Sequence, residues 1–164
     1  MNLSPVVVLT SLAALATAAA GGMMYVFSVM VMPGLNRTGP VEALTAMRGI
    51  NAQANASPAF LLPFFGATIL ALAVGVMAVV QLNQPGSWWL LAGAIFGILG
   101  AIITMVFNVP LNNHLDTLNP ERLSVADAAR EWQAFLSTWT AWNHTRSATG
   151  FVGAVLMLIG LRYR

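Results

Sequence analysis

Four apolar stretches of this sequence are each long enough to cross a membrane as a helix. A helix needs roughly 20 apolar residues to span the hydrocarbon core of a bilayer. Stretches of that length occupy residues 6–32, 60–82, 88–111 and 135–161. The composition agrees, because 58% of the residues are hydrophobic and 7% are charged, whereas about a quarter of a soluble domain is charged. The chain is therefore expected to be an integral membrane protein of a bacterial cell membrane.

The same composition excludes several kinds of chemistry. The chain has no cysteine, so it can form neither a disulfide nor a thiolate metal site. Its net charge is +2, with no basic cluster that could follow a phosphate backbone, so nucleic acid is not an expected partner. No phosphate-binding loop, dinucleotide-binding motif or zinc-protease motif is present. The expected partners are the lipid bilayer and a hydrophobic small molecule.

The connections between the stretches predict the topology. Pro85 and Gly86 form a short turn between the second and third helices, which makes these two antiparallel neighbours. Between the first and second, an apolar residue recurs every three positions from Val41 to Ile50, as in a short amphipathic helix lying at the membrane interface. Ser124 caps the start of a long fourth helix. We therefore predict an all-α fold: a single domain over residues 1–164, with four transmembrane helices in an up-down bundle.

Small and polar residues share faces of the predicted helices. At about 100° per residue, the third helix aligns one stripe, and its Gly93 and Gly97 form a GxxxG motif that favours close helix packing. The first helix has a matching stripe that includes Tyr25. The same small-residue faces offer a route to a homo-oligomer. The third-helix stripe contains Gly93, Gly97, Ala101, Thr104, Asn108 and Asn112.

Arg146 is the strongest single clue to function. A rise of about 1.5 Å per residue places it roughly 22 Å from the far end of the fourth helix, inside a core about 30 Å thick. No acidic residue lies in the apolar stretches, and Asn108, Asn112 and Asn143 offer only carbonyl acceptors. An ionisable residue at this depth indicates a functional site. Two interpretations remain open: Arg146 binds an anion, or it has a purely structural, hydrogen-bonded role.

The fourth helix also carries aromatic residues and a histidine. Trp132, Trp139 and Trp142 lie near the expected interface, where they form either a membrane aromatic belt or the wall of a binding site. His144 is about 100° around the helix from Asn143. It is a candidate base, or it faces a neighbouring helix.

Four motifs in this order resemble the anthrone oxygenase family of small membrane proteins. They are GGMMYVFSVMVMPGL, AMRGINAQANASPAF, NVPLNNHL and WTAWNHTRSATG. The resemblance extends from about Gly21 to Gly150 and implies an enzyme that oxidises anthrones to anthraquinones. It places these residues at the family's motif positions: Asn51, Asn108, Asn112, Trp139, Asn143, His144 and Arg146.

The resemblance suggests a mechanism that needs no cofactor and no metal. An anthrone has an acidic methylene group, and the anion formed from it could react directly with dioxygen. His144, with an unperturbed pKa of about 6.5, is the candidate base. Arg146, with the amides of Asn108 and Asn143, would stabilise the developing oxyanion. The substrate would contact Tyr25, Asn51, Asn112, Trp139 and Trp142.

Two alternatives of other classes remain open. The first is a non-catalytic membrane protein that binds a lipid or isoprenoid, or that serves as a subunit of a membrane assembly. The second is an oxidoreductase in which His114 and His144 together bind a haem or a metal ion. Two histidines without a nearby acid or thiolate would be a weak metal site.

Overall fold

The computed structural model describes residues 4–164, and this part of the chain is helical with no strands. The expected all-α fold is therefore confirmed. Two π-helical turns, η1 and η2, and one 3₁₀ turn, η3, separate some of the α-helices. In chain order the elements are α1 (Pro5–Val26), η1 (Phe27–Val31), α2 (Met32–Leu35), α3 (Pro40–Ala56), α4 (Pro58–Val80), α5 (Ser87–Ile103), η2 (Thr104–Asn108), α6 (Val109–Thr117), η3 (Pro120–Arg122) and α7 (Val125–Arg162).

Three continuous helical segments are long and apolar enough to cross a membrane. They are Pro5–Leu35, Pro58–Val80 and Ser87–Thr117. They correspond to three of the four expected spans and identify the chain as an integral membrane protein. The fourth expected span lies in the second half of α7 and is not among these three segments, so it stays a prediction.

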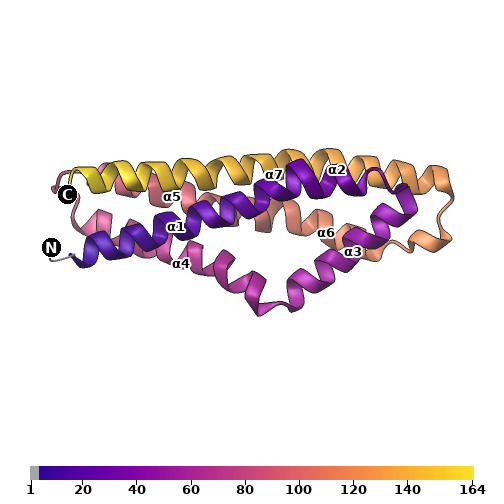
Figure 1. Ribbon diagram of the computed structural model, residues 1–164, viewed down its shortest axis with the longest axis horizontal. Helices are drawn as coiled ribbons and strands as arrows, with labels where there is room; N and C mark the ends of the chain where they lie inside the picture. The colour runs from indigo at the N-terminus through magenta and orange to yellow at the C-terminus, as the bar shows by residue number, and fades with distance from the viewer. Residues whose placement is uncertain (1–3) are drawn as a thin grey trace.

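The helices divide the molecule into two parts along α7 (Figure 1). In one part, α1 and α5 pack against the C-terminal half of α7, and α4 packs against α1 and α5. The start of α1 lies at the same end as the end of α7. In the other part, α3 and α6 pack along the N-terminal half of α7. Helices α3 and α4 meet at Ser57 and form a V whose apex points away from α7.

Glycines bring two helices of the first part into backbone contact, as the GxxxG motif predicts. A Cβ atom added to Gly93 of α5 would lie 2.8 Å from the carbonyl oxygen of Gly153 in α7. A Cβ atom on Gly153 would in turn lie 2.9 Å from the carbonyl oxygen of Gly93. Real Cβ atoms do not approach other atoms this closely, so both positions require glycine. Such small-residue contacts replace the hydrophobic effect as the packing force between helices in lipid.

Two helices continue further than their sequences suggest, because π turns accommodate their prolines. A proline lacks the backbone N–H, and its ring clashes with the carbonyl four residues earlier. η1 and η2 each end two residues before a proline, Pro33 or Pro110, and the wider turn relieves that clash. The third predicted helix therefore ends at Thr117 rather than near Leu111. The polar residues after Pro110 stay helical and pack toward α3 and α7.

The amphipathic segment between the first two spans is a helix, α3, as expected. Leu44 and Met47 are fully buried, and Val41 and Ile50 are partly buried against the same cluster. This cluster also contains the aromatic residues of α7, so the apolar face of α3 packs on protein. The position of α3 at a membrane interface stays a prediction.

Candidate functional site

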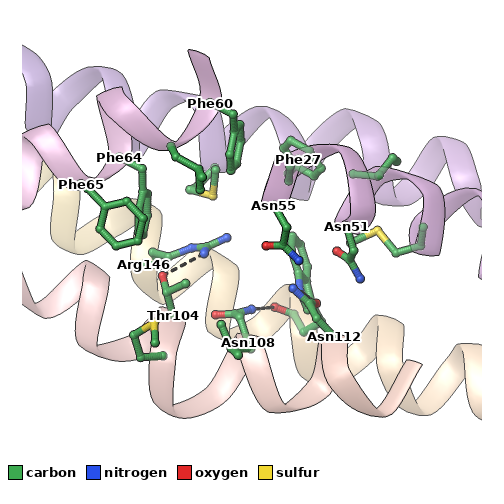
Figure 2. A pocket seen from close by; sticks show the side chains of 18 residues that line it. Phe27, Asn51, Asn55, Phe60, Phe64, Phe65, Thr104, Asn108, Asn112 and Arg146 are labelled. Carbon is green, nitrogen blue, oxygen red and sulfur yellow. Dashed lines mark hydrogen bonds between the residues drawn. The ribbon is translucent and has the colours of Figure 1, made fainter. Parts of the chain in front are cut away.

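A cavity of about 340 Å³ lies where the two parts of the molecule join. Its walls come from α1, η1, α3, α4, η2, α6 and α7, and it is mostly apolar (Figure 2). Its volume is within the range of small-molecule binding pockets. The lining residues are Met24, Phe27, Met47, Ile50, Asn51, Ala54, Asn55, Phe60, Leu61, Phe64, Phe65, Thr104, Met105, Asn108, Val109, Asn112, Trp139 and Arg146.

Among the described residues, Arg146 is the one charged side chain in this lining, and it is only 7% exposed. Its Nη1 donates to Thr104 Oγ1 at 2.9 Å, and its Nε donates to Asn143 Oδ1 at 3.1 Å. Its Nη2 also donates to Asn143 Oδ1. The guanidinium carbon lies 5.7 Å from the ring centre of Trp139, in a cation–π contact. Since a guanidinium has five N–H groups, two donors remain free beside the cavity.

This charge has no carboxylate to balance it. Within residues 4–164 the cavity lining contains no Asp or Glu. In the described chain, Arg130 pairs with Asp127, and His114 contacts Glu131. Both contacts involve residues near the start of α7, more than about 20 Å of helical rise before Arg146. A buried cation is costly unless it is paired. The cavity is therefore suited to a ligand that carries, or develops, negative charge on an oxygen.

Asn143 holds Arg146 in place from behind the cavity. The side chain of Asn143 is fully buried. Its Nδ2 donates to the carbonyl oxygen of Met24 and to Ser28 Oγ, each at 2.6 Å. Because these bonds fix the amide, its Oδ1 is directed to Arg146. The amide of Asn143 was expected to stabilise an oxyanion, but this residue does not line the cavity. Its contacts are instead those of a residue that positions Arg146.

An aromatic ladder on α7 leads to the cavity. The rings of Trp132, Phe135 and Trp139 stack in succession, with centres 6.0 and 6.1 Å apart. All three are buried, so they form interior packing and not a lipid-facing belt. Trp139 forms part of the cavity wall, and its Nε1 donates to Asn112 Oδ1 at 2.9 Å. Trp132 makes the equivalent bond to Asn36 Oδ1, also at 2.9 Å.

Three of the predicted asparagines reach the cavity from three helical elements. Asn51 comes from α3, and Asn108 and Asn112 come from η2 and α6. Asn108 Nδ2 donates to the carbonyl oxygen of Trp139 at 3.3 Å. The Oδ1 of Asn108 and the Nδ2 of Asn51 are buried without a hydrogen-bond partner. Both atoms are thus available to a ligand.

Comparison with known proteins identifies the family. The model of the anthrone oxygenase family matches residues 56–156, which is more than half of the chain. The chain belongs to the anthrone oxygenase family. No curated protein and no solved structure shows significant similarity to it. The matched segment contains the parts of the cavity contributed by α4, η2, α6 and α7, including Arg146, whereas Asn51 precedes it.

His144 of this anthrone oxygenase family member does not line the cavity. It is exposed, and it lies along a separate shallow groove with Ser28, Asn36 and Thr140. The reason is helical geometry, because two residues separated by one position point about 200° apart around a helix. Since Arg146 points into the cavity, His144 points to the other side of α7. The structure therefore does not bring the candidate base and the candidate oxyanion-binding residue together.

Two further predicted substrate contacts also lie outside the cavity lining. Tyr25 is 49% exposed and packs edge-on against Phe151, with ring centres 6.4 Å apart. Trp142 stacks on Phe107, with centres 3.6 Å apart and planes 6° apart. Neither residue is among those that line the cavity.

The two histidines of the alternative metal or haem site are not neighbours. His114 Nε2 lies 3.0 Å from Glu131 Oε2, near the start of α7. His144 follows Glu131 on the same helix after about 20 Å of rise. Among residues 4–164, no group of three or more His, Cys, Asp or Glu residues is placed to hold a metal ion. The donor set therefore does not fit the arrangement that the alternative requires.

Sequence reasoning missed the wall that α4 contributes. Phe60, Phe64 and Phe65 line the cavity opposite Thr104 and Asn108 (Figure 2). Their i, i+4 spacing places Phe60 and Phe64 on one helix face, which was the available signal. Thr104 was on the predicted stripe of the third helix, but its bond to Arg146 depends on the position of α7 relative to η2.

Proposed function

We propose that this protein is a membrane oxygenase that converts a flat, hydrophobic, anthrone-like ketone to the corresponding quinone with dioxygen. The observation that supports this most directly is Arg146, a buried cation with free donors and no carboxylate partner in an apolar, aromatic cavity. Family membership gives independent support for oxygenase chemistry.

We further propose that the C-terminal half of α7 is the fourth transmembrane helix of an up-down bundle. It packs against both α1 and α5, each of which belongs to a segment long and apolar enough to span a membrane. Helices that pack in this way share the same depth in the bilayer. The cavity then lies toward one membrane face, where a substrate dissolved in lipid can reach it.

In the reaction, the methylene group of the ketone loses a proton, and the resulting negative charge spreads onto the ketone oxygen. The two free N–H groups of Arg146 bind that oxygen, which lowers the free energy of the anion. A new carbon–oxygen bond forms between the former methylene carbon and dioxygen, and protonation gives a hydroperoxide. Loss of water then leaves the second carbonyl. Overall, one ketone and one dioxygen give one quinone and one water.

The proton leaves without the help of His144, which faces another side of α7. The lining of the cavity, as far as the structure describes it, holds no histidine or carboxylate. Arg146 instead makes the bound ketone more acidic by stabilising its anion. The proton passes to water along the asparagine side of the cavity, where Asn55 is exposed.

The test is turnover by the purified protein in lipid nanodiscs. Anthrone is added, and oxygen uptake and quinone formation are followed together. Equal rates of oxygen uptake and quinone formation, both of which depend on the protein, would support the proposal. Tight binding of an anionic lipid in the cavity, with no quinone formed above the uncatalysed rate, would instead favour the non-catalytic lipid-binding alternative.

A further inference from the structure

Asn108 has a buried oxygen atom that no group in the protein satisfies. The side chain is 1% exposed, and its Oδ1 has no hydrogen-bond partner. The orientation of the amide is fixed, because Nδ2 donates to the carbonyl oxygen of Trp139 at 3.3 Å. If the amide were turned over, its oxygen would face that carbonyl oxygen. The unpaired atom of this cavity-lining amide is therefore an acceptor.

An unsatisfied buried acceptor is costly, and in proteins such groups are rare. The lining supplies few donors, since it is largely made of apolar and aromatic side chains. Asn51 carries an unpaired donor, but it belongs to α3 on another wall of the cavity. A ligand with an O–H group meets this requirement, whereas a ligand with only carbonyl oxygens does not.

The position of Asn108 defines where that O–H group must lie. Thr104 and Asn108 are the first and last residues of η2, and side chains at this spacing are about 5–6 Å apart at Cβ on a helix. Thr104 holds Arg146 through a 2.9 Å bond. Figure 2 shows the Asn108 oxygen on the side of its amide that faces Thr104. The cavity thus presents a cationic donor and a neutral acceptor about one helical turn apart.

We infer that Asn108 is a specificity-determining residue that accepts a hydrogen bond from a hydroxyl group on the aromatic ring system of the substrate. In the bound substrate, the ketone oxygen binds Arg146 and the ring hydroxyl binds Asn108. This inference rests on the proposed function for the placement of the ketone. It adds a second recognition point on the same ligand.

A panel of anthrones tests this inference. Unsubstituted anthrone is compared with monohydroxyanthrones that differ in the position of the hydroxyl group. Binding to the wild-type protein in nanodiscs is measured under nitrogen by quenching of tryptophan fluorescence, and turnover is measured in air. At least one hydroxyl isomer should bind about tenfold or more tightly than anthrone, since a buried hydrogen bond contributes about 1.5 kcal/mol. Equal affinity across the whole panel would overturn the inference.

Two variants separate a specific role from a structural one. In Asn108→Leu, the ratio of the affinity for the hydroxyl isomer to the affinity for anthrone should fall to about one, whether or not both affinities also change. Asn112→Leu is the matched control, because Asn112 also lines the cavity but its Oδ1 already accepts from Trp139 Nε1. That variant should keep the preference. A preference that survives in Asn108→Leu would also contradict the inference.

The binding measurement is independent of catalysis. A hydroxyl preference without quinone formation would leave Asn108 as a recognition residue and remove the oxygenase proposal. Quinone formation without any hydroxyl preference would keep the oxygenase proposal and overturn the role of Asn108.

Discussion

At the scale of single residues, the proposed chemistry depends most on Arg146. It combines a permanent charge, two free donors and a ring contact with Trp139. Arg146→Met should lower kcat/KM for anthrone by about 10²–10³-fold, which is the usual effect of removing an oxyanion donor. Arg146→Lys should recover only part of this loss, because an ammonium group keeps the charge but not the fork of donors. Steady-state quinone formation in nanodiscs measures kcat/KM for the two variants. Full activity in Arg146→Met would contradict the oxyanion role.

Substitution of His144, unlike that of Arg146, is expected to leave activity nearly unchanged. Its side chain is exposed along a different groove, so His144→Ala should leave kcat within about twofold of the wild-type value, as for surface substitutions away from structural features. Steady-state quinone formation in nanodiscs measures this. A large loss of activity in His144→Ala would contradict the placement of His144 outside the cavity.

At the scale of helices, close packing between α5 and α7 positions one wall of the site. Gly153→Ala would place a Cβ atom 2.9 Å from the carbonyl oxygen of Gly93 and from the nitrogen of Gly97. We expect a loss of about 1–3 kcal/mol in the free energy of unfolding from overpacking. Gly22→Ala is the control, because nothing lies within 4 Å of an added Cβ there. Chemical unfolding in detergent compares the two, and equal stability would argue against the backbone contact.

The π turn η2 links a proline to the shape of the cavity. Pro110→Ala restores a backbone N–H and removes the ring that disfavours a regular α-helical turn. The turn is then free to tighten, which rotates α6 and moves Asn112 away from Trp139 Nε1, its partner at 2.9 Å. We expect stability to be kept or raised while affinity for anthrone falls by about fivefold or more. Pro63→Ala, in the interior of α4, controls for the loss of a proline as such. Unchanged affinity in Pro110→Ala would show that η2 does not depend on the proline.

At the scale of the whole molecule, the sequence predicted the membrane class and the buried arginine without a carboxylate partner for physical reasons. Apolar length identifies spans without knowledge of their neighbours. The absence of an acid near Arg146 could likewise be recognised from the order of residues alone. The GxxxG motif predicted a contact, although its partner Gly153 required the structure.

The remaining features depend on how the helices are placed. The V formed by α3 and α4 brings Phe60 and Phe64 to the cavity, and no local pattern encodes that angle. His144 seemed a candidate base from its neighbours in the motif, but the orientation of α7 directs Arg146 to the cavity and His144 away from it. The third helix was expected to end near Leu111, because a proline usually stops a helix. In the structure the π turn η2 lets the helix continue past Pro110.

The most direct measurement of the central claim is the pKa of a hydroxyanthraquinone bound in the cavity. Its visible absorption changes when the hydroxyl group ionises, so the bound ligand can be titrated in nanodiscs. If Arg146 stabilises an oxyanion, the charged form is favoured, and the pKa of the bound ligand should be lower than in lipid without protein, by one unit for each 1.36 kcal/mol of stabilisation. In Arg146→Met, the apolar cavity should instead raise the pKa of the bound ligand. A pKa that is raised in the wild-type protein, or equal in the two proteins, would contradict the claim that this cavity binds a negatively charged oxygen.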